Sequence, residues 1–202
     1  MEVTPDLFKS LLVILKDFRG VYDEGVFFKR INAMCGQAVF INKKIEIKSN
    51  GKVSIYRQSS RDLGFMQFAE IGAGEKTLWL GSLHGKTLPG NKLDTPIRLK
   101  QSEKIINFFA NKSSPKIIGG DFNLMPDTKS IELIEKAGYR NLIRDFNIQE
   151  TRNRLSWEQF PEEQKQHFAD YVFVSEDVKV NTFEAPPVEV SDHLPQILDF
   201  EV

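Results

Sequence analysis

The sequence has 202 residues, of which 41% are hydrophobic and 27% charged, and this composition is ordinary for one globular domain covering residues 1–202. The formal net charge of −1 argues against a broad nucleic-acid footprint, and no apolar run reaches the ~20 residues that span a bilayer. Cys35 is the only cysteine and the N-terminus lacks a signal-peptide pattern, so we expect a cytoplasmic protein, which we take to be a monomer.

The N-terminal quarter predicts a helix followed by strands. Residues 4–6 (Thr-Pro-Asp) are a helix start, because Thr caps, Pro suits the first helical position and an acid favours the first turn. Apolar residues at helical spacing extend this helix to Phe18, and Gly20 ends it. The period then changes to that of strands at 36–42 and 43–48, and Asn50-Gly51 predicts a two-residue hairpin turn.

The rest of the chain alternates strands with helices. Strands are expected at 63–71, 76–84, 115–121, 169–175, 179–185 and 195–202, and helices at 96–111 and from Asp127 or Thr128 to Ala137, with Gly138 as the stop. Some neighbouring strands form hairpins and others connect through helices. This mixture predicts an α/β protein with mixed sheets packed together and helices outside.

Four stretches place a polar, chemically capable residue where an apolar strand begins or ends. They contain His84, the pair Asp121 and Asn123, Asp170, and the dipeptide Asp192-His193. Any one of them is more often a structural histidine or a turn-forming acid. Loops at strand ends are also where a rigid scaffold presents reactive groups. Because the chain has only three histidines, the four stretches together indicate a site.

The stretch GGDFN at 119–123 indicates the chemistry of that site. In extended backbone, residues two apart project to the same side, so Asp121 and Asn123 should face one ligand. Gly119 and Gly120 would let backbone or ligand come close. Oxygen-rich ligands suit Mg²⁺ or Mn²⁺ rather than zinc. The sequence contains no HExxH, CxxC, GxSxG or Walker A pattern that would favour another chemistry.

The chain resembles the endonuclease/exonuclease/phosphatase superfamily, which has the deoxyribonuclease I-like fold. The matching stretches, in the family's order, are SLHG (82–85), Arg98 with Gln101, GGDFN (119–123), ADYVFVS (169–175) and SDHLP (191–195). Residues 1–5 before the first helix resemble the family's strand end that carries a metal-binding glutamate. The resemblance implies two packed mixed sheets flanked by helices in a four-layer α/β/β/α sandwich, and a metal-dependent phosphoester hydrolase.

The resemblance also implies which residues hold the metal and the phosphate. Glu2 would be the main ligand of Mg²⁺, or of Mn²⁺, and Asp192 would lie beside the metal. Asn123 would contact the scissile phosphate or its leaving side. His84 would donate to a phosphate oxygen or assist the leaving group. Phosphoester hydrolysis needs such cationic and donor groups to neutralise developing charge.

The remaining implied roles concern the attacking water. Asp121 would orient or activate it, and His193 would act on the phosphate or as the general base. Asp170 would hold and polarise His193, because a buried aspartate sets the tautomer of a histidine and stabilises its charged form.

The substrate is expected to be a phosphoester, either nucleic acid or a small phosphodiester or phosphomonoester. Histidine at position 84, where abasic-site endonucleases of the family tend to carry tyrosine, favours the other branches. Between the motifs, Arg152, Arg154 and Trp157 are candidate substrate-binding residues that could stack on a base or sugar and hold phosphate. The same three residues could equally be plain surface that shields the core.

The family begins with a strand that carries an asparagine, and here nothing precedes the Glu2 stretch. We therefore expect an N-terminally truncated form of the fold, with a start that is truncated or misplaced or, as the alternative, a reduced form that has lost the strand. Reduced stability and activity are expected for residues 1–202. The alternative function is a catalytically impaired relative that acts as a binding module; the missing asparagine favours it, and the retained acids and histidines oppose it.

Overall fold

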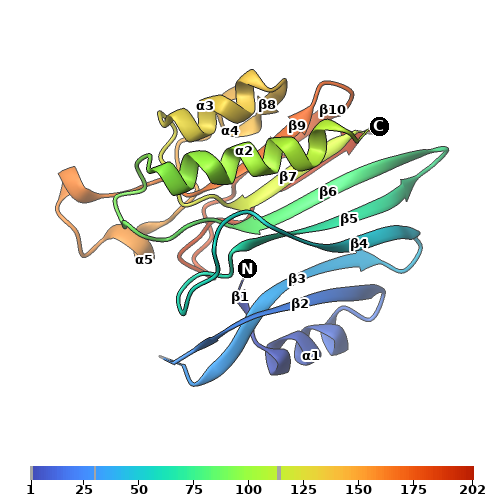
Figure 1. The fold of residues 1–202 in the computed structure, drawn as a ribbon, viewed down its shortest axis with the longest axis horizontal. Helices are drawn as coiled ribbons and strands as arrows, with labels where there is room; N and C mark the ends of the chain where they lie inside the picture. The colour runs from blue at the N-terminus through green and yellow to red at the C-terminus, as the bar shows by residue number, and fades with distance from the viewer. Residues whose placement is uncertain (1, 30, 113–114) are drawn as a thin grey trace.

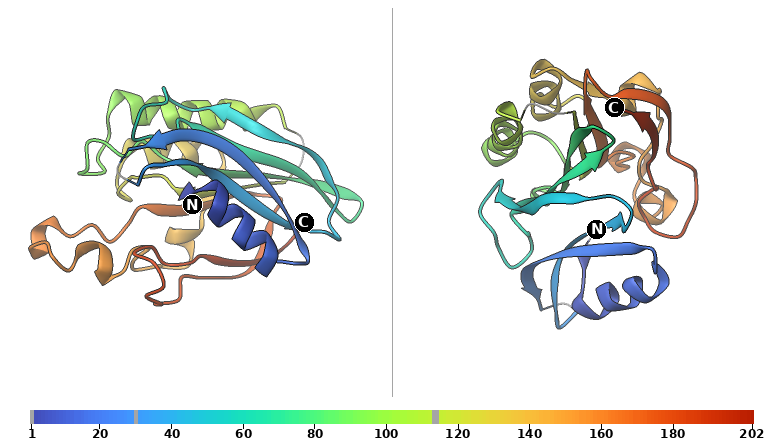
Figure 2. Two further views of the ribbon diagram at one scale, coloured as in Figure 1. Left: turned by 90° about the horizontal axis from the view of Figure 1, so that it is seen from below. Right: turned by 90° about the vertical axis from the view of Figure 1, so that its right-hand side faces the viewer.

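The computed structural model describes residues 2–29, 31–112 and 115–202, with the backbone alone for Glu2. The described chain forms two groups of strands that pack face to face, with helices on both outer surfaces (Figures 1 and 2). Helices α2 and α3 cover one surface, and α1 covers the other. The four-layer α/β/β/α arrangement expected from the sequence is therefore confirmed.

The larger sheet has six strands and carries most of the residues that matter for the site. Their order across the sheet is β4-β5-β6-β7-β9-β8, and only the β6–β7 pair is parallel. The strands are β4 (Ile47–Ser54), β5 (Phe65–Ala73), β6 (Lys76–His84), β7 (Lys116–Asp121), β8 (Tyr139–Asn141) and β9 (Asp170–Ser175). The parallel pair requires a crossover connection, which α2 supplies.

Two smaller antiparallel sheets face the larger one. One has the order β1-β3-β2 and the other pairs β10 with β11. Their strands are β1 (Glu2–Val3), β2 (Phe18–Phe28), β3 (Ala33–Asn42), β10 (Lys179–Glu184) and β11 (Ile197–Glu201). Glu2 pairs with Gln37 at the edge of the first of these sheets.

Helices α1 and α2 begin at capping threonines. The helical segments are α1 (Pro5–Ile14), α2 (Pro96–Ala110), α3 (Lys129–Lys136), α4 (Leu142–Asp145), α5 (Arg154–Trp157) and a 3₁₀ turn η1 (Glu162–Gln164). The side chain of Thr4 accepts a hydrogen bond from the Leu7 amide, and that of Thr95 accepts one from the Arg98 amide. Each cap precedes a proline at the first helical position, as the sequence predicted for α1.

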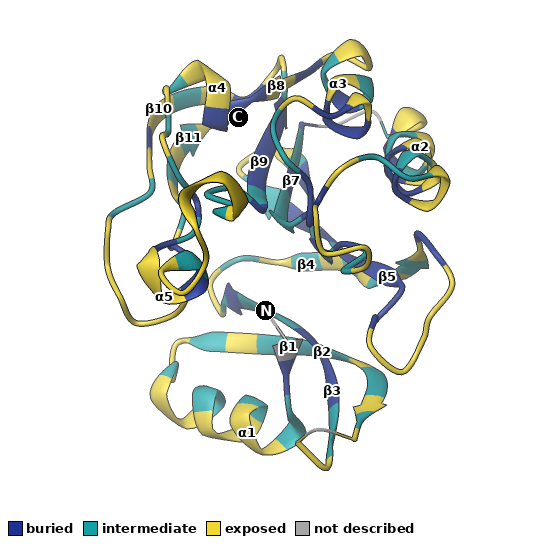
Figure 3. Cartoon of the chain, turned by 90° about the vertical axis from the view of Figure 1, so that its left-hand side faces the viewer, coloured by how far each residue is buried: buried dark blue, intermediate teal, exposed yellow. Residues whose placement is uncertain are grey.

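The alternation of side chains along β6 divides the core into two parts. Trp79 and Leu83 point toward α2, where Phe109 is fully buried. Leu78, on the opposite face, packs with Ile41 of β3 and Phe200 of β11. Figure 3 shows the buried strands between the exposed outer faces of α1 and α2. The interface between the two sheet layers therefore ends where β6 ends, at His84.

Three local predictions were wrong. The first helix ends at Ile14, and Phe18 begins β2 and pairs with Asn42 of β3, so long-range strand pairing overrides the helical spacing there. Asn50-Gly51 lies inside β4, opposite Ala69 and Phe68, instead of forming a hairpin turn. The strand expected at 43–48 is wrong as well, since residues 43–45 form a turn and β4 begins only at Ile47.

The candidate active site

His84, Asp121 and Asp170 form one row across three neighbouring strands. His84 is the register partner of Asp121 between β6 and β7, and Asp121 is the partner of Asp170 between β7 and β9. Because directly paired residues project to the same face of a sheet, the three side chains lie side by side at one end of the interface between the sheet layers. Three separate stretches of sequence thus meet at one point.

Two glycines allow the strands to come close enough to form this row. A Cβ atom on Gly120, where φ is +133°, would lie 2.2 Å from the carbonyl oxygen of Leu83, and one on Gly85 would lie 2.2 Å from that of Phe122. Neither position has room for a side chain. Gly119 is different, since a Cβ there would meet Val172 at an ordinary 3.5 Å. The close approach expected at the glycine pair is therefore an approach of neighbouring backbone. It requires glycine at position 120 and not at position 119.

Asn123 faces the same pocket as Asp121, but for a different reason from the one expected. Its φ of +54° places it in the left-handed region, so the backbone is not extended between the two residues. The Asp121 carboxylate instead accepts from the Asn123 backbone amide at 2.7 Å and from its Nδ2 at 3.2 Å. This turn fixes the acid and the amide relative to each other.

His193 completes the row from the opposite side. Its Nδ1 atom lies 2.7 Å from Oδ2 of Asp170. Burial alone would lower the pKa of His193, but the hydrogen bond and charge of Asp170, with smaller effects of Asp121 and Asp192, raise it above 6.5. His84 stands on the other side of Asp121, with its Nε2 atom 3.7 Å from Oδ2 of that acid.

Thr151 positions the Asp170–His193 pair, and sequence reasoning missed it. This residue is fully buried, and its hydroxyl accepts from the backbone amides of Ala169 and Asp170. Its carbonyl accepts from the Leu194 amide, next to His193. One threonine therefore ties the start of β9 to the loop that carries the histidine.

Asp192 lies at the rim of the row. Its Oδ2 atom is 3.8 Å from Nε2 of His193 and 3.6 Å from Nη2 of Arg152. The side chain is half exposed. Glu2, the other expected metal ligand, has its backbone at the edge of the neighbouring sheet, and its side chain lies outside the described residues.

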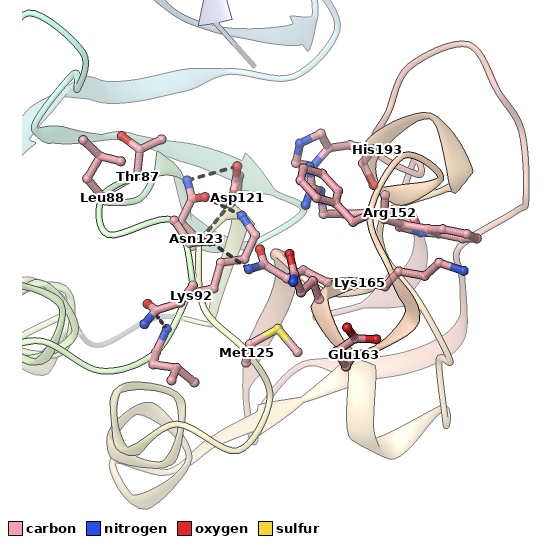
Figure 4. Close-up of a pocket in the computed structure, with 18 of the residues that line it drawn as sticks. Thr87, Leu88, Lys92, Asp121, Asn123, Met125, Arg152, Glu163, Lys165 and His193 are labelled. Carbon is pink, nitrogen blue, oxygen red and sulfur yellow. Dashed lines mark hydrogen bonds between the residues drawn. The ribbon is translucent and has the colours of Figure 1, made fainter.

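A pocket of about 950 Å³ opens over this row, and Figure 4 shows the residues that line it. His84, Asp121, Asn123 and His193 contribute to its wall, as do Arg152 and Trp157 from the stretch expected to bind substrate. A volume of this size suits a small organic ligand.

Arg154 is not among the residues that line this pocket. Its guanidinium donates to both carboxylate oxygens of Glu189, at 2.6 and 2.8 Å, and to Glu158. It therefore joins the α5 segment to the loop before His193.

The donor atoms at the floor of the pocket fit a divalent cation. One ligand atom from each of Asp121, Asp170 and His193 lies within 4.8 Å of the other two. Both carboxylate side chains are only 14% exposed, so their negative charges repel each other with little solvent screening. The two carboxylates are the oxygen donors that Mg²⁺ or Mn²⁺ prefers, and a cation beside them would offset the repulsion.

Lys92 is a further residue of the pocket that the sequence did not reveal. Its Nζ atom donates to Oδ1 of Asn123 at 2.8 Å. A lysine in a loop, between Gly90-Asn91 and Leu93, is indistinguishable by composition from a solvated surface lysine.

Comparison with solved structures finds the same architecture. An endonuclease/exonuclease/phosphatase from Bacteroides vulgatus shares 19% identity, with a TM-score of 0.78 over all of this chain and 82% of that one. A mannosyl-6-phosphatase from Bacteroides thetaiotaomicron shares 15% identity over 98% of this chain and 82% of that one, with a TM-score of 0.72. TDP2 from D. rerio, complexed with a single-strand DNA product, shares 13% identity over 100% and 84%, with a TM-score of 0.72.

These identities are low, so the three structures establish the fold and no more. The sequence comparison with curated proteins found no match. The model of the endonuclease/exonuclease/phosphatase family, in contrast, matches residues 1–193. That range includes the row His84–Asp121–Asp170 and reaches His193. The chain therefore belongs to the endonuclease/exonuclease/phosphatase family.

Proposed function

We propose that this protein hydrolyses phosphoester bonds with the help of a divalent cation, Mg²⁺ or Mn²⁺. The observation that supports this most directly is the Asp170–His193 hydrogen bond beside Asp121 at the floor of a pocket. A histidine held by a carboxylate is suited to accept a proton from water. The neighbouring carboxylate, Asp121, is suited to orient that water.

The proposed reaction is an in-line displacement. The oxygen of a water molecule held by Asp121 forms a bond to phosphorus while its proton passes to Nε2 of His193. The bond from phosphorus to the ester oxygen breaks, and that oxygen takes a proton from solvent or from His84. His84 donates to a phosphate oxygen, where negative charge grows in the transition state, and Asn123 holds Asp121 beside the phosphate.

Glu2 and Asp192 would hold the cation, as the resemblance implies, and the carboxylates of Asp121 and Asp170 lie where they would add oxygen ligands, while His193 stays free to act as the base. A bound divalent cation supplies positive charge that polarises the phosphoryl oxygens. Because Asp170 is also hydrogen-bonded to His193, its second oxygen is the one free for this role.

Phosphosugars and nucleic acids are the two substrate classes to compare. One structurally similar protein is a mannosyl-6-phosphatase, and another was crystallised with a single-strand DNA product. Arg152 and Trp157 on the pocket wall would suit a substrate that joins a phosphate to a ring, as phosphosugars and nucleotides do. We infer a phosphoester with a ring next to the scissile phosphate.

The test is hydrolysis of bis-p-nitrophenyl phosphate, p-nitrophenyl phosphate, plasmid DNA and a hexose 6-phosphate, each with Mg²⁺, Mn²⁺ or EDTA. Hydrolysis that requires the cation and is abolished in Asp121→Ala is the expected result. Asp6→Ala is the matched control, since that carboxylate is 95% exposed on α1. A folded Asp121→Ala protein with wild-type turnover would refute the proposal.

The same panel addresses the alternative, a binding module without catalysis. Such a protein would bind phosphoesters in the calorimeter and hydrolyse none of the four. Plasmid nicking without release of nitrophenol or phosphate would identify a nuclease.

A further inference from the structure

Lys92 is a buried lysine inside the pocket. The residue is only 7% exposed, and its ammonium donates to the neutral amide oxygen of Asn123. Among the residues that the structure describes, no carboxylate lies within ion-pair distance of this ammonium. A buried ammonium satisfied by one amide keeps much of its desolvation cost. Among the described residues the ammonium therefore has no direct ion-pair partner, and the carboxylates of Asp121 and Asp170 act on it only from a distance.

The surrounding loop fixes Lys92 in this position. Arg98 is fully buried, and its guanidinium donates to four loop carbonyls. These belong to Lys86, Thr87, Pro89 and Leu93. Lys92 itself has a φ of +57°, and its carbonyl accepts from the Met125 amide at 2.9 Å. The loop is thus attached on both sides of the lysine.

Two more contacts anchor the ends of the same loop. Oε1 of Gln101 accepts from the Lys86 amide at 2.9 Å. The Asp94 carboxylate accepts from the amides of Lys129 and Ser130 and so caps α3. These contacts hold the loop backbone, so the fold specifies the position from which the Lys92 side chain enters the pocket.

Arg152 presents a second cation to the pocket. Its Nε atom is buried and has no hydrogen-bond partner within the described part of the chain. Figure 4 shows Lys92 and Arg152 reaching into the pocket from opposite sides, with Asp121 and His193 between and above them. Burial lowers the pKa of Lys92, the charge of Asp121 opposes that change, and the nearby charge of Arg152 adds to it.

We propose that Lys92 and Arg152 bind the substrate phosphate between them, with Lys92 contacting a non-bridging oxygen from the Asn123 side. A phosphate oxygen would give the ammonium a direct ion-pair partner. Lys92 also orients Asn123: because Oδ1 accepts from the ammonium, Nδ2 is directed to Asp121 and to the Gly85 carbonyl. This inference rests on the proposed function, and inorganic phosphate binding tests it separately.

The experiment measures inorganic phosphate binding by calorimetry, in EDTA and in Mg²⁺, and hydrolysis of bis-p-nitrophenyl phosphate. Lys92→Met is expected to lose at least about tenfold in phosphate affinity and about 10²–10³-fold in kcat/KM. Lys92→Arg should recover part of both. Lys136→Met is the control, because that lysine is 68% exposed on α3 and pairs with Glu132.

Failure of this inference is distinguishable from failure of the proposed function. The wild type could bind phosphate and hydrolyse none of the substrates, while Lys92→Met no longer binds phosphate. That result would refute the hydrolase and support the phosphate site. An active Lys92→Met protein with wild-type phosphate affinity would overturn the site. If Lys92→Met does not fold, the ¹⁵Nζ resonance of Lys92 in the wild type decides. It should shift on phosphate titration, and no shift at saturating phosphate would also overturn the site.

Discussion

The Nδ1 atom of His193 lies 2.7 Å from Oδ2 of Asp170, although the two residues are 23 positions apart. Asp170 is in turn the register partner of Asp121 in the neighbouring strand. Removing the charge of the Asp170 carboxylate should therefore change both the proton affinity of His193 and its orientation. The pairing of β7 with β9, which aligns Asp121 and Asp170, should not be disturbed.

The pH profile of hydrolysis should report this pair. His193 must be neutral to accept a proton, and the Asp170 carboxylate raises its pKa above 6.5. We expect kcat/KM to rise with pH through a pKa above 6.5 in the wild type. In Asp170→Asn that limb should move to lower pH, with a lower plateau. If the rising limb lies at the same pH in the wild type and in Asp170→Asn, His193 is excluded as the base.

Gly120 and Gly119 form a matched pair for a stability test. A Cβ on Gly120 would overlap the Leu83 carbonyl at 2.2 Å in a backbone conformation with φ +133°, whereas one on Gly119 has an ordinary contact at 3.5 Å. Gly120→Ala should lower the free energy of unfolding by about 1–3 kcal/mol or more. Gly119→Ala should change it much less. Urea unfolding of both variants measures the difference, and equal effects would contradict the role of Gly120.

Asp62 should be important for the stability of the loop that carries Lys92. Its buried carboxylate accepts from Lys86 Nζ at 2.5 Å, from the Thr87 amide at 3.1 Å and from Ser59 Oγ at 2.6 Å. Asp62→Asn leaves the Lys86 ammonium without its partner and should cost about 3 kcal/mol. Thermal melts compare it with Asp127→Asn, whose carboxylate is fully exposed.

The same carboxylate predicts a pH dependence of stability. Burial would raise the pKa of Asp62, but hydrogen bonds from Lys86, Ser59 and Thr87 outweigh it and lower the pKa from 3.8 to about 2. A folded-state pKa below the unfolded one stabilises the protein above pH 3.8, and this contribution is lost as the pH falls toward 2. Asp62→Asn should flatten the fall in stability between these values. An unchanged slope would show that other groups cause it.

Much of this site could be predicted from strand ends and short motifs. His84, Asp121 and Asp170 each sit at the end of an apolar run that became a strand, because alternation and β-branched residues specify such strands locally. The features that could not be predicted depend on contacts between distant parts of the chain. Asn50-Gly51 favours a turn, yet pairing with β5 keeps it in a strand. The burial of Lys92 depends on Arg98 and on contacts with α3, which no local pattern encodes.

The stretch around Trp157 was left open between substrate binding and plain surface, and it yields the last prediction. The indole lines the pocket, its Nε1 atom donates to the Arg152 carbonyl at 3.3 Å, and its ring lies 4.9 Å from that of His167. Stacking of a base on an aromatic ring contributes about 1–3 kcal/mol, so Trp157→Ala should raise KM roughly tenfold for a nucleotide substrate. Trp157→Phe should retain most of the affinity.

Inorganic phosphate is the internal comparison, because it has no ring to stack. Its affinity should be the same in Trp157→Ala and in the wild type if the Arg152 backbone stays in place. A loss of phosphate binding equal to the rise in KM would mean that the indole supports Arg152 and contacts no ring of the substrate. An unchanged KM for nucleotides and phosphosugars alike would assign Trp157 to the surface, since a stacking partner cannot be removed without weakening ring binding.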